Sequence, residues 1–274
     1  MEKLIQIIIE CGAGSAAAIQ YADCDIINPR LAEKIPFTPK SVFIGTIPYY
    51  THFCCEPKTV SSYALAYDYH TYIKNLGESI IEKAKQVYPN ANFMCFGDHS
   101  PINEKIAAAK AGLGIIGEHS LLITPNHSSF VFLFEIITDI ECNIVAQAVS
   151  YCEKCGKCIN ACPSDISDKR TCLSAITQKK GELTDKEALL INKSSCAWGC
   201  DICQEVCPYT IRAKERGTIY TNNPWFNSEV LNCPSAETVD CESDFKSRAY
   251  SWRGTATILR NLNIINSDIN GESK

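Results

Sequence analysis

Two cysteine-rich stretches decide how this sequence folds: CEKCGKCINACP at residues 152–163 and CDICQEVCP at residues 200–208. The first has the spacing C-x2-C-x2-C-x3-C-P, and the second has the spacing C-x2-C-x3-C-P. Two-residue gaps let a tight loop direct successive thiolates at one iron–sulfur cube, and the cysteine before proline ligates the other cube. Proline at that position ends the loop and has no N–H to leave unpaired. The pattern therefore predicts two 4Fe–4S clusters.

Structural zinc is the alternative interpretation of these cysteines. Zinc takes four ligands, usually as two separated pairs. It does not call for a run of four cysteines that ends in proline, and here a second, similar run follows. The spacing favours iron–sulfur clusters over zinc.

Counting thiolates shows that the two runs are one ligand short, because two cubes need eight and the runs supply seven. The first cube is expected to be held by Cys152, Cys155, Cys158 and Cys207. The second is expected to be held by Cys162, Cys200, Cys203 and one further cysteine. That eighth ligand is either Cys172, in the segment RTCLSAI, or Cys196, four residues before Cys200. Spacing alone leaves both open.

The overall composition is that of a folded protein with reduced thiols. The chain has 274 residues, of which 46% are hydrophobic, and a formal charge of −5. This charge excludes a generally basic nucleic-acid-binding surface, although it allows a local basic patch. The 17 cysteines are odd in number, and the chain is too long to need a disulfide framework. The apolar runs of the chain are too short to predict a leader or a membrane span. The apolar run at 130–137 is broken by Glu135. We expect a cytoplasmic protein with no membrane partner.

Residues 1–150 alternate between helical and strand-like patterns, which is typical of an α/β (α+β) layer structure. Strands are predicted at 41–47 and 92–96, and two more, at 121–123 and 129–138, are expected to be joined by a turn. Helices are predicted from residue 69, ending at Pro89, at 101–111 and at 244–262. We divide the chain into an α/β domain (1–145), a two-cluster ferredoxin-like domain (146–212) and a C-terminal helical segment with a tail (213–274).

Several further stretches accompany the cysteine runs in a fixed order. They are ALAYDYHTYIKNL (64–76), FGDHSPINEKIAAAKAGLGIIGEHSLLITP (96–125), RTCLSAIT (170–177) and SRAYSWRGTATILRNLNII (247–265). Together with the cysteine runs they resemble the epoxyqueuosine reductase family, from about residue 40 to about residue 265. Reductive dehalogenases share the same general plan, but the aspartate loop and the RTC segment favour the first family. The resemblance is to a short form that lacks the family's C-terminal helical repeats.

The resemblance implies a cobalamin-binding α/β domain joined to the two-cluster domain, and it implies an oxidoreductase. Such an enzyme removes the oxygen of an epoxide on a tRNA nucleoside and leaves an alkene, the last step of queuosine synthesis. The reaction takes two electrons, which two cubes and a low-valent cobalt can supply, and protons, which a protein group must donate. The resemblance further implies that Cys172 is the eighth ligand and Cys196 an extra thiol.

By the same resemblance Asp98 is the catalytic proton donor, expected in a poorly hydrated pocket that raises its pKa. An aspartate before Ser-Pro is also a common helix cap. His99 follows it where a small residue is expected. Contacts to the cobalamin are expected from Gly112, Gly114, Gly117, His119, Ser120, Tyr69 and His70. For Gly112 a helix C-cap explains the glycine equally well.

Three functions remain open at this point. The first is epoxide reduction on tRNA, with an external electron donor such as a flavodoxin or ferredoxin. The second keeps the cofactors but acts on a small molecule, because the missing repeats and the negative charge argue against a large RNA contact. The third is a two-cluster electron carrier without enzymatic activity. Candidate phosphate-binding residues are Arg212, Lys214, Arg216, Arg248, Arg253 and Arg260.

Overall fold

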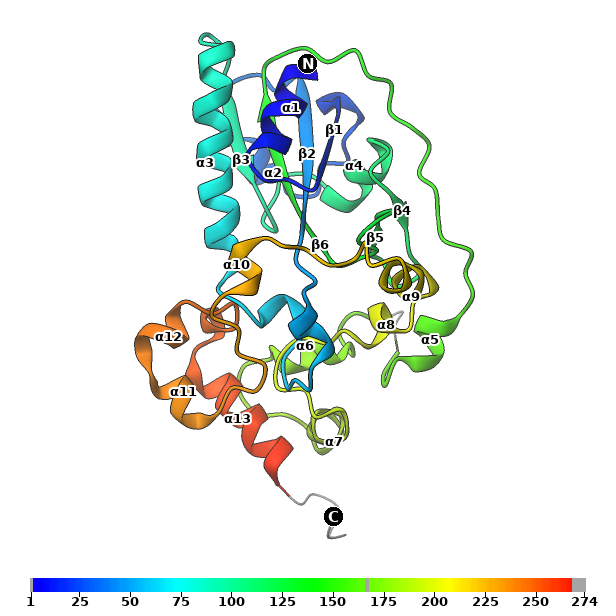
Figure 1. The fold of residues 1–274 in the computed structure, drawn as a ribbon, viewed down its shortest axis with the longest axis vertical. Coiled ribbons are helices and arrows are strands. Elements are labelled where there is room, and N and C mark those ends of the chain that lie inside the picture. The colour runs from blue at the N-terminus through cyan, green and yellow to red at the C-terminus, as the bar shows by residue number, and fades with distance from the viewer. Residues whose placement is uncertain (1, 166–167, 268–274) are drawn as a thin grey trace. The chain divides into compact units, whose positions relative to one another are not determined.

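The computed structural model describes residues 2–165 and 168–267, which Figure 1 shows as a ribbon. They form two compact units whose segments alternate along the chain. Unit 1 comprises Met1–Tyr49, His70–Cys155 and Arg212–Ile219. Unit 2 comprises Tyr50–Tyr69, Gly156–Ile211 and Tyr220–Lys274. The domain boundaries expected near residues 145 and 212 stay predictions about which segments fold independently.

Unit 1 is built on a four-stranded sheet. Its strands, in spatial order, are β1 (Ser15–Gln20), β2 (Ser41–Pro48), β6 (Val131–Thr138) and β3 (Phe93–Phe96). All three neighbouring pairs are antiparallel. Every residue of β2 is buried, as expected for a continuous apolar run in the centre of a sheet. The strands predicted at 41–47 and 92–96 are confirmed.

The predicted pairing of segments 121–123 and 129–138 is wrong. The first forms β5 (Leu122–Ile123), which pairs with β4 (Ile115–Ile116) in a separate two-stranded sheet. The second contains β6, which pairs with β2 and β3. The residues between them close their own turn through a bridge of Thr124 and Ser128. The long apolar β6 is thereby free to fill the centre of the larger sheet.

Helices α1 (Glu2–Glu10), α3 (Tyr69–Val87) and α4 (Glu104–Lys110) accompany this sheet. In α3 the buried residues recur every three or four positions, from Ile73 to Ala84, so one face of the helix packs on the core. Gly77 permits close approach to β3, because a Cβ there would lie 2.4 Å from the Sγ of Cys95. Helix α4 begins at Glu104 rather than at Pro101, because the Asn103 side chain accepts the N–H of Ile106.

Helix α4 covers an apolar layer that includes Ile44, Phe96, Ile137 and its own Ala108. Alternate residues of a strand face the same side of a sheet. Glu135 therefore points to the same side as Ile137, and it lies opposite Ile44 and Phe96 in the strand register. An acidic side chain is thus placed inside an apolar layer.

Unit 2 consists mainly of short helices. They are α5 (Lys157–Ala161), α6 (Leu173–Thr177), α7 (Asp185–Ser194), α8 (Ile202–Glu205), α10 (Pro224–Asn227), α11 (Ala236–Asp240), α12 (Glu242–Lys246) and α13 (Thr255–Asn266), and α9 (Pro208–Glu215) begins in it. The helix expected at 244–262 is interrupted, because Gly254 at φ 83° separates α13 from the preceding turn. No helix in the described part of the chain is long and apolar enough to cross a membrane.

Candidate functional site

Asp98 lies at the tip of a tight turn that follows β3 in unit 1. Its φ of 61° is left-handed, a conformation that aspartate tolerates better than most residues, and the N–H of His99 donates to the Gly97 carbonyl at 2.7 Å. Asp98 Oδ2 is 3.3 Å from Nε2 of His70, in the first turn of α3. The structure therefore brings together two residues that were predicted separately, and it places His70 against the carboxyl.

The poorly hydrated pocket expected around Asp98 is not formed by the described residues. The Asp98 side chain is 63% exposed and that of His70 is 46% exposed. The turn projects both groups outward, because β3 ends at Phe96. Neither side chain is desolvated by the chain itself, so a poorly hydrated environment for Asp98 stays a prediction.

Two carboxyls that the sequence analysis did not single out lie behind this turn. The N–H of Asp98 donates to Glu104 Oε1 at 3.4 Å. Burial, and next the charge of Asp98, raise the pKa of Glu104 to about 7. Glu135 is completely buried, and burial, followed by the charge of Glu104, raises its pKa well above the usual value. The available signal was Glu135 itself, an acid that interrupts an otherwise apolar strand.

The glycines predicted to contact cobalamin have roles within unit 1. Gly112, at φ 85°, ends α4: its N–H donates to Ala109 and the next N–H donates to Ala108, each at 3.0 Å, as in a Schellman cap. A Cβ on Gly114 would lie 2.3 Å from the Ile123 carbonyl oxygen, and a Cβ on Gly117 would lie 2.4 Å from the His119 ring. Local packing therefore explains all three glycines, and their contact with a cofactor stays a prediction.

His119 is a buried histidine in this segment that accepts a hydrogen bond from the backbone. Its Nδ1 accepts the N–H of Leu121 at 3.2 Å. Burial, and next the charge of Lys105, lower the pKa of His119 to about 4, so the ring is neutral at pH 7. Because Nδ1 accepts, the proton lies on Nε2, which has no partner among the described residues. Ser120 follows in a left-handed turn.

Tyr69 is the first residue of α3. Its ring packs edge-on against Tyr63 with a centroid separation of 6.2 Å. This contact fixes the ring within unit 2, to which Tyr69 belongs. A role for Tyr69 in cofactor binding stays a prediction.

Four cysteines come together in unit 2. Cys162 and Cys172 act electrostatically on both Cys200 and Cys203, whose pKa values are raised to about 12 mainly by burial. Cys196 also interacts electrostatically with Cys200, but its thiol donates to the Gly199 carbonyl at 3.1 Å, whereas Cys172 acts on both Cys200 and Cys203. These interactions favour Cys172 over Cys196 as the partner of the other three. The RTC segment provides Cys172 as the residue that precedes α6.

The remaining predicted ligands fall into two groups. In unit 1, Cys152 Sγ accepts the N–H of Glu118 at 3.3 Å, and Cys155 is exposed. In unit 2, Cys158 and Cys207 are buried. The grouping of these four around one cube stays a prediction from their spacing. Within the two described ranges no three His, Cys, Asp or Glu side chains are placed to hold one metal ion; in a cube, by contrast, each thiolate binds a different iron.

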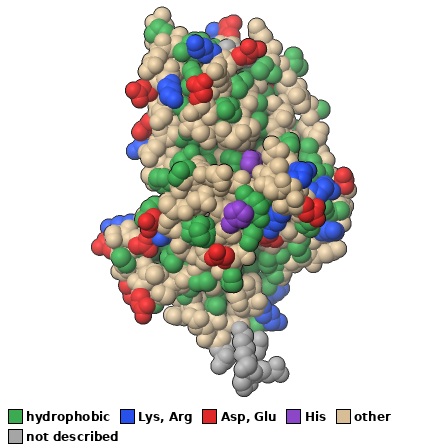
Figure 2. Space-filling model, viewed as in Figure 1, with side chains coloured by type: hydrophobic (Ala, Val, Ile, Leu, Met, Phe, Trp, Pro, Cys, Tyr) green, Lys and Arg blue, Asp and Glu red, His purple; other side chains and the backbone are tan. Residues whose placement is uncertain are grey.

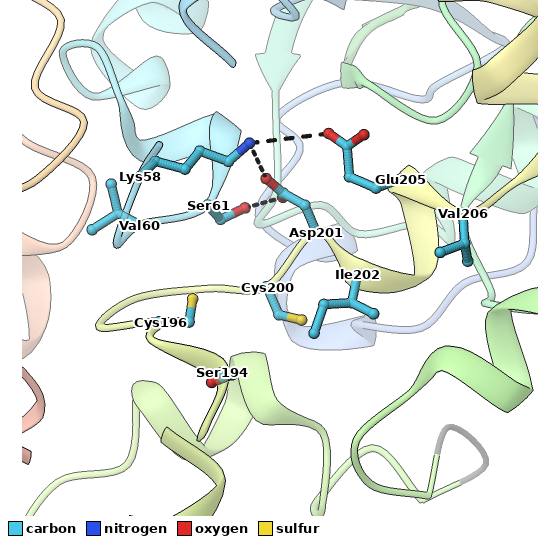
Figure 3. A pocket seen from close by; sticks show the side chains of 10 residues that line it. All are labelled: Lys58, Val60, Ser61, Ser194, Cys196, Cys200, Asp201, Ile202, Glu205 and Val206. Atoms are coloured by element: carbon cyan, nitrogen blue, oxygen red, sulfur yellow. Dashed lines mark hydrogen bonds and ion pairs between the residues drawn. The ribbon is translucent and has the colours of Figure 1, made fainter. Parts of the chain in front are cut away.

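A cavity of about 310 Å³ lies beside Cys200 in unit 2 (Figure 3). The buried Asp201 accepts hydrogen bonds from the Ser61 hydroxyl and, at 2.7 Å each, from the N–H and hydroxyl of Ser62. The Lys58 amine lies between the carboxylates of Asp201, at 3.6 Å, and Glu205, at 4.0 Å. These bonds anchor the loop that carries Cys200 to residues 58–62.

Most of the arginines suggested for RNA binding have structural partners. Arg248 is buried, pairs with Asp244 at 2.8 Å and donates to the Leu65 carbonyl at 3.1 Å. Arg260 donates to the Lys179 carbonyl at 2.8 Å, and Arg216 donates to the Pro125 carbonyl at 2.8 Å. Arg253 stacks on the exposed Trp252. On the face that Figure 2 shows, basic and acidic side chains of the described residues are interspersed.

Comparison with known proteins first defines a class. Residues 151–210 match the family described as a 4Fe-4S double cluster binding domain. This segment contains all eight predicted cysteine ligands. The expected architecture, mixed helix and sheet with a two-cluster ferredoxin-like segment, is therefore confirmed.

The relatives then define the family. An epoxyqueuosine reductase of Cellulophaga algicola is 32% identical over 255 residues, which cover 87% of this chain and 80% of the relative. One of Aliivibrio fischeri is 31% identical over 215 residues, which cover 75% of this chain and 57% of the relative. The chain belongs to the epoxyqueuosine reductase family.

The solved structures agree on the fold. A crystal structure of epoxyqueuosine reductase with an epoxyqueuosine-modified tRNA stem loop superposes with a TM-score of 0.78 at 20% identity, over 96% of this chain and 80% of that chain. The chain spans about half to two thirds of the length of several relatives, with matches covering 57%, 51% and 65% of them.

Proposed function

We propose that this protein reduces the epoxide of epoxyqueuosine in tRNA to the alkene of queuosine. The observation that carries the proposal is that a chain of this family combines the cysteine quartet of unit 2 with the Asp98–His70 pair of unit 1. An electron carrier without enzymatic activity would need only the cysteine quartet. Removing the oxygen as water requires two electrons and two protons, which calls for both kinds of site.

The cysteines fit two iron–sulfur cubes. Cys172 is the proposed eighth ligand, because its thiol interacts with those of Cys200 and Cys203. Cys162 completes that set, and the other cube takes Cys152, Cys155, Cys158 and Cys207. When bound, each cube supplies one electron at a time. Burial of the Cys200 and Cys203 thiols raises their pKa and disfavours free thiolate, so iron is what makes the charged form stable there.

A cobalamin fits unit 1 at His119. The buried Nε2–H of His119 lacks an acceptor among residues 2–165 and 168–267, and the amide oxygens of a corrin provide one. Ser120 is the adjacent polar group, and Gly112, Gly114, Gly117, Tyr69 and His70 are the further proposed contacts. When bound, the low-valent cobalt supplies a centre that collects two electrons.

The chain's own residues handle the protons. Asp98 is the proposed donor to the leaving oxygen, because its carboxyl is presented at the tip of the turn after β3. His70 contacts Asp98 Oδ2 and is half exposed, so it connects that carboxyl with solvent protons. After one proton has gone to the oxygen, Asp98 regains a proton through this contact. General acid catalysis of this kind contributes about 10²- to 10⁴-fold in rate.

The proposed partners are tRNA and a soluble electron donor. A solved epoxyqueuosine reductase contains a modified tRNA stem loop, and this chain shares its fold. A flavodoxin or ferredoxin is the proposed donor, because the cubes accept one electron at a time. We infer that the protein works in the cytoplasm, where these partners occur.

Purified protein can test the proposal directly. Anaerobically reconstituted enzyme, supplied with cobalamin and a low-potential reductant, is mixed with an epoxyqueuosine-modified stem loop or with the free nucleoside. We expect mass spectrometry to show loss of one oxygen from the stem loop, and no loss with Asp98→Asn enzyme. Equal conversion of the free nucleoside supports the small-molecule alternative. Intact clusters with no conversion of either substrate would contradict the proposal.

A further inference from the structure

Glu135 is an unusual residue for the middle of a sheet. Its side chain is completely buried in the apolar layer under α4. Neither carboxylate oxygen has a hydrogen-bond partner of ordinary geometry in the described part of the chain, although the Ser100 hydroxyl lies close enough to favour its charged form. An isolated buried carboxylate is strongly unfavourable. Apolar residues occupy the neighbouring positions of the strand register, Ile44 and Phe96. Packing alone does not account for an acid here.

Glu135 interacts electrostatically with Glu104, which lies in the first turn of α4. Each carboxyl disfavours ionisation of the other, because two like charges share a poorly solvated region. Glu104 also accepts the N–H of Asp98. Glu104 therefore interacts with the buried Glu135 and also with the backbone of the exposed Asp98. The Asp98 residue that it contacts has a left-handed φ.

Few other titratable groups face this pair. Lys105 favours the charged form of Glu104, and the Ser100 hydroxyl favours the charged form of Glu135. Cys24 and Cys95 interact electrostatically with Glu135, and burial raises the pKa of each thiol to about 12. Both thiols are therefore neutral at pH 7. His70 faces Asp98 at 3.3 Å, so the electrostatic balance is set by the three carboxyls together with this imidazole.

We propose that Glu104 is a positioning residue that holds the Asp98 turn by accepting the Asp98 N–H. The inference rests on the proposed function only in assigning proton donation to Asp98. The charge of Asp98 contributes to the raised pKa of Glu104, so the two carboxyls are coupled electrostatically as well as joined through the Asp98 N–H.

Infrared spectroscopy of the anaerobic holoenzyme tests this without any substrate. Wild-type protein at pH 7 is expected to show a carboxylic-acid C=O band that Glu135→Gln removes. A second component should disappear as the pH rises through about 7, should be absent in Glu104→Gln, and should titrate at lower pH in Asp98→Asn. Glu82→Gln, at an exposed position of α3, is the matched control and should change none of these bands.

The rate of epoxide reduction separates positioning from a merely structural role. Glu104→Gln keeps an oxygen that accepts the Asp98 N–H but loses the charge. Its kcat and its KM for the stem loop should therefore stay close to the wild-type values. Glu104→Ala loses the acceptor as well and should lower kcat at every pH.

Three results would overturn the inference: an unshifted second component in Asp98→Asn, a wild-type kcat in Glu104→Ala, or a kcat in Glu104→Gln as low as that in Glu104→Ala. An enzyme that shows the bands but reduces no epoxide would contradict the proposed function and leave the carboxyl assignment standing. The two failures are therefore distinguishable.

Discussion

In unit 2 the reactive groups are cysteines that local spacing places in order along the chain. In unit 1 they are carboxyls and a histidine that come from β6, α4, α3 and the turn after β3. A cluster loop collects its ligands within a few residues. A proton site needs only one or two groups, and it acquires its properties from burial and charge supplied by distant segments. Single substitutions are therefore expected to have different effects in the two units: loss of bound iron in unit 2, and changes in rate or pH dependence in unit 1.

The largest effect is expected from a cluster ligand in unit 2. Cys203→Ser should reduce bound iron from about eight to about four atoms per chain and abolish epoxide reduction, because the electron path is broken. Iron analysis of anaerobically purified protein measures this. Cys233→Ser, an exposed cysteine outside both predicted sets, is the control and should keep all the iron. Full iron content in Cys203→Ser would remove Cys203 from the ligand set.

A comparison of two neighbouring cysteines sharpens the assignment of the eighth ligand. Cys172→Ser should lose one cluster, because its thiol interacts with those of Cys200 and Cys203. Cys196→Ser should keep both clusters, because its thiol donates to a backbone carbonyl. Iron content and the visible absorption of the oxidised clusters distinguish them. The reverse pattern would favour Cys196.

In unit 1, loss of the proposed proton donor should leave the electron path intact. Asp98→Asn is expected to lower the rate of epoxide reduction by about 10²- to 10⁴-fold, with unchanged iron and unchanged reduction of the clusters by dithionite. Single-turnover assays of the reduced enzyme measure the rate. A wild-type rate would show that the proton comes from elsewhere, and lost iron would mean that the change disturbs folding.

The smallest effect concerns stability and pH. Burial makes Glu135 bind its proton more tightly in the folded chain than in the unfolded chain. The resulting contribution to stability is fully present below about pH 4 and is lost as the pH rises toward the raised folded pKa. Glutamine does not titrate. The free energy of unfolding of Glu135→Gln, relative to that of wild type, should therefore increase by on the order of 1 kcal/mol per pH unit in that window.

Thermal melts between pH 5 and pH 8 check this difference. The melting temperature of Glu135→Gln relative to wild type should increase with pH. Glu82→Gln should run parallel to wild type throughout, because its side chain is exposed. Parallel curves for Glu135→Gln would mean that this carboxyl is not held neutral by burial.

The sequence was sufficient where a feature is local. Spacing predicted the cysteine runs, and hydrophobic periodicity predicted β2, β3 and α3. It failed where partners are distant: nothing near 121–123 indicates that β5 pairs with β4 instead of with β6. Choosing Cys172 over Cys196 likewise requires knowing which thiols converge, and this depends on how α6 packs.

The candidate proton site was only partly predictable. Asp98 and His70 were singled out separately by resemblance, but their 3.3 Å contact joins two segments 28 residues apart. Glu135 was visible as an interruption of an apolar run, yet its complete burial depends on neighbouring strands and on α4, which lie far away in the sequence. The glycines at 112, 114 and 117 show the opposite case, because internal packing accounts for them.

Native mass spectrometry of the wild-type chain, purified without oxygen, tests the central claim most directly. The account predicts a mass increase equal to two 4Fe–4S clusters, with both lost together with colour on exposure to air. A chain that carries zinc, a single cluster, or disulfides among residues 152–207 would contradict it.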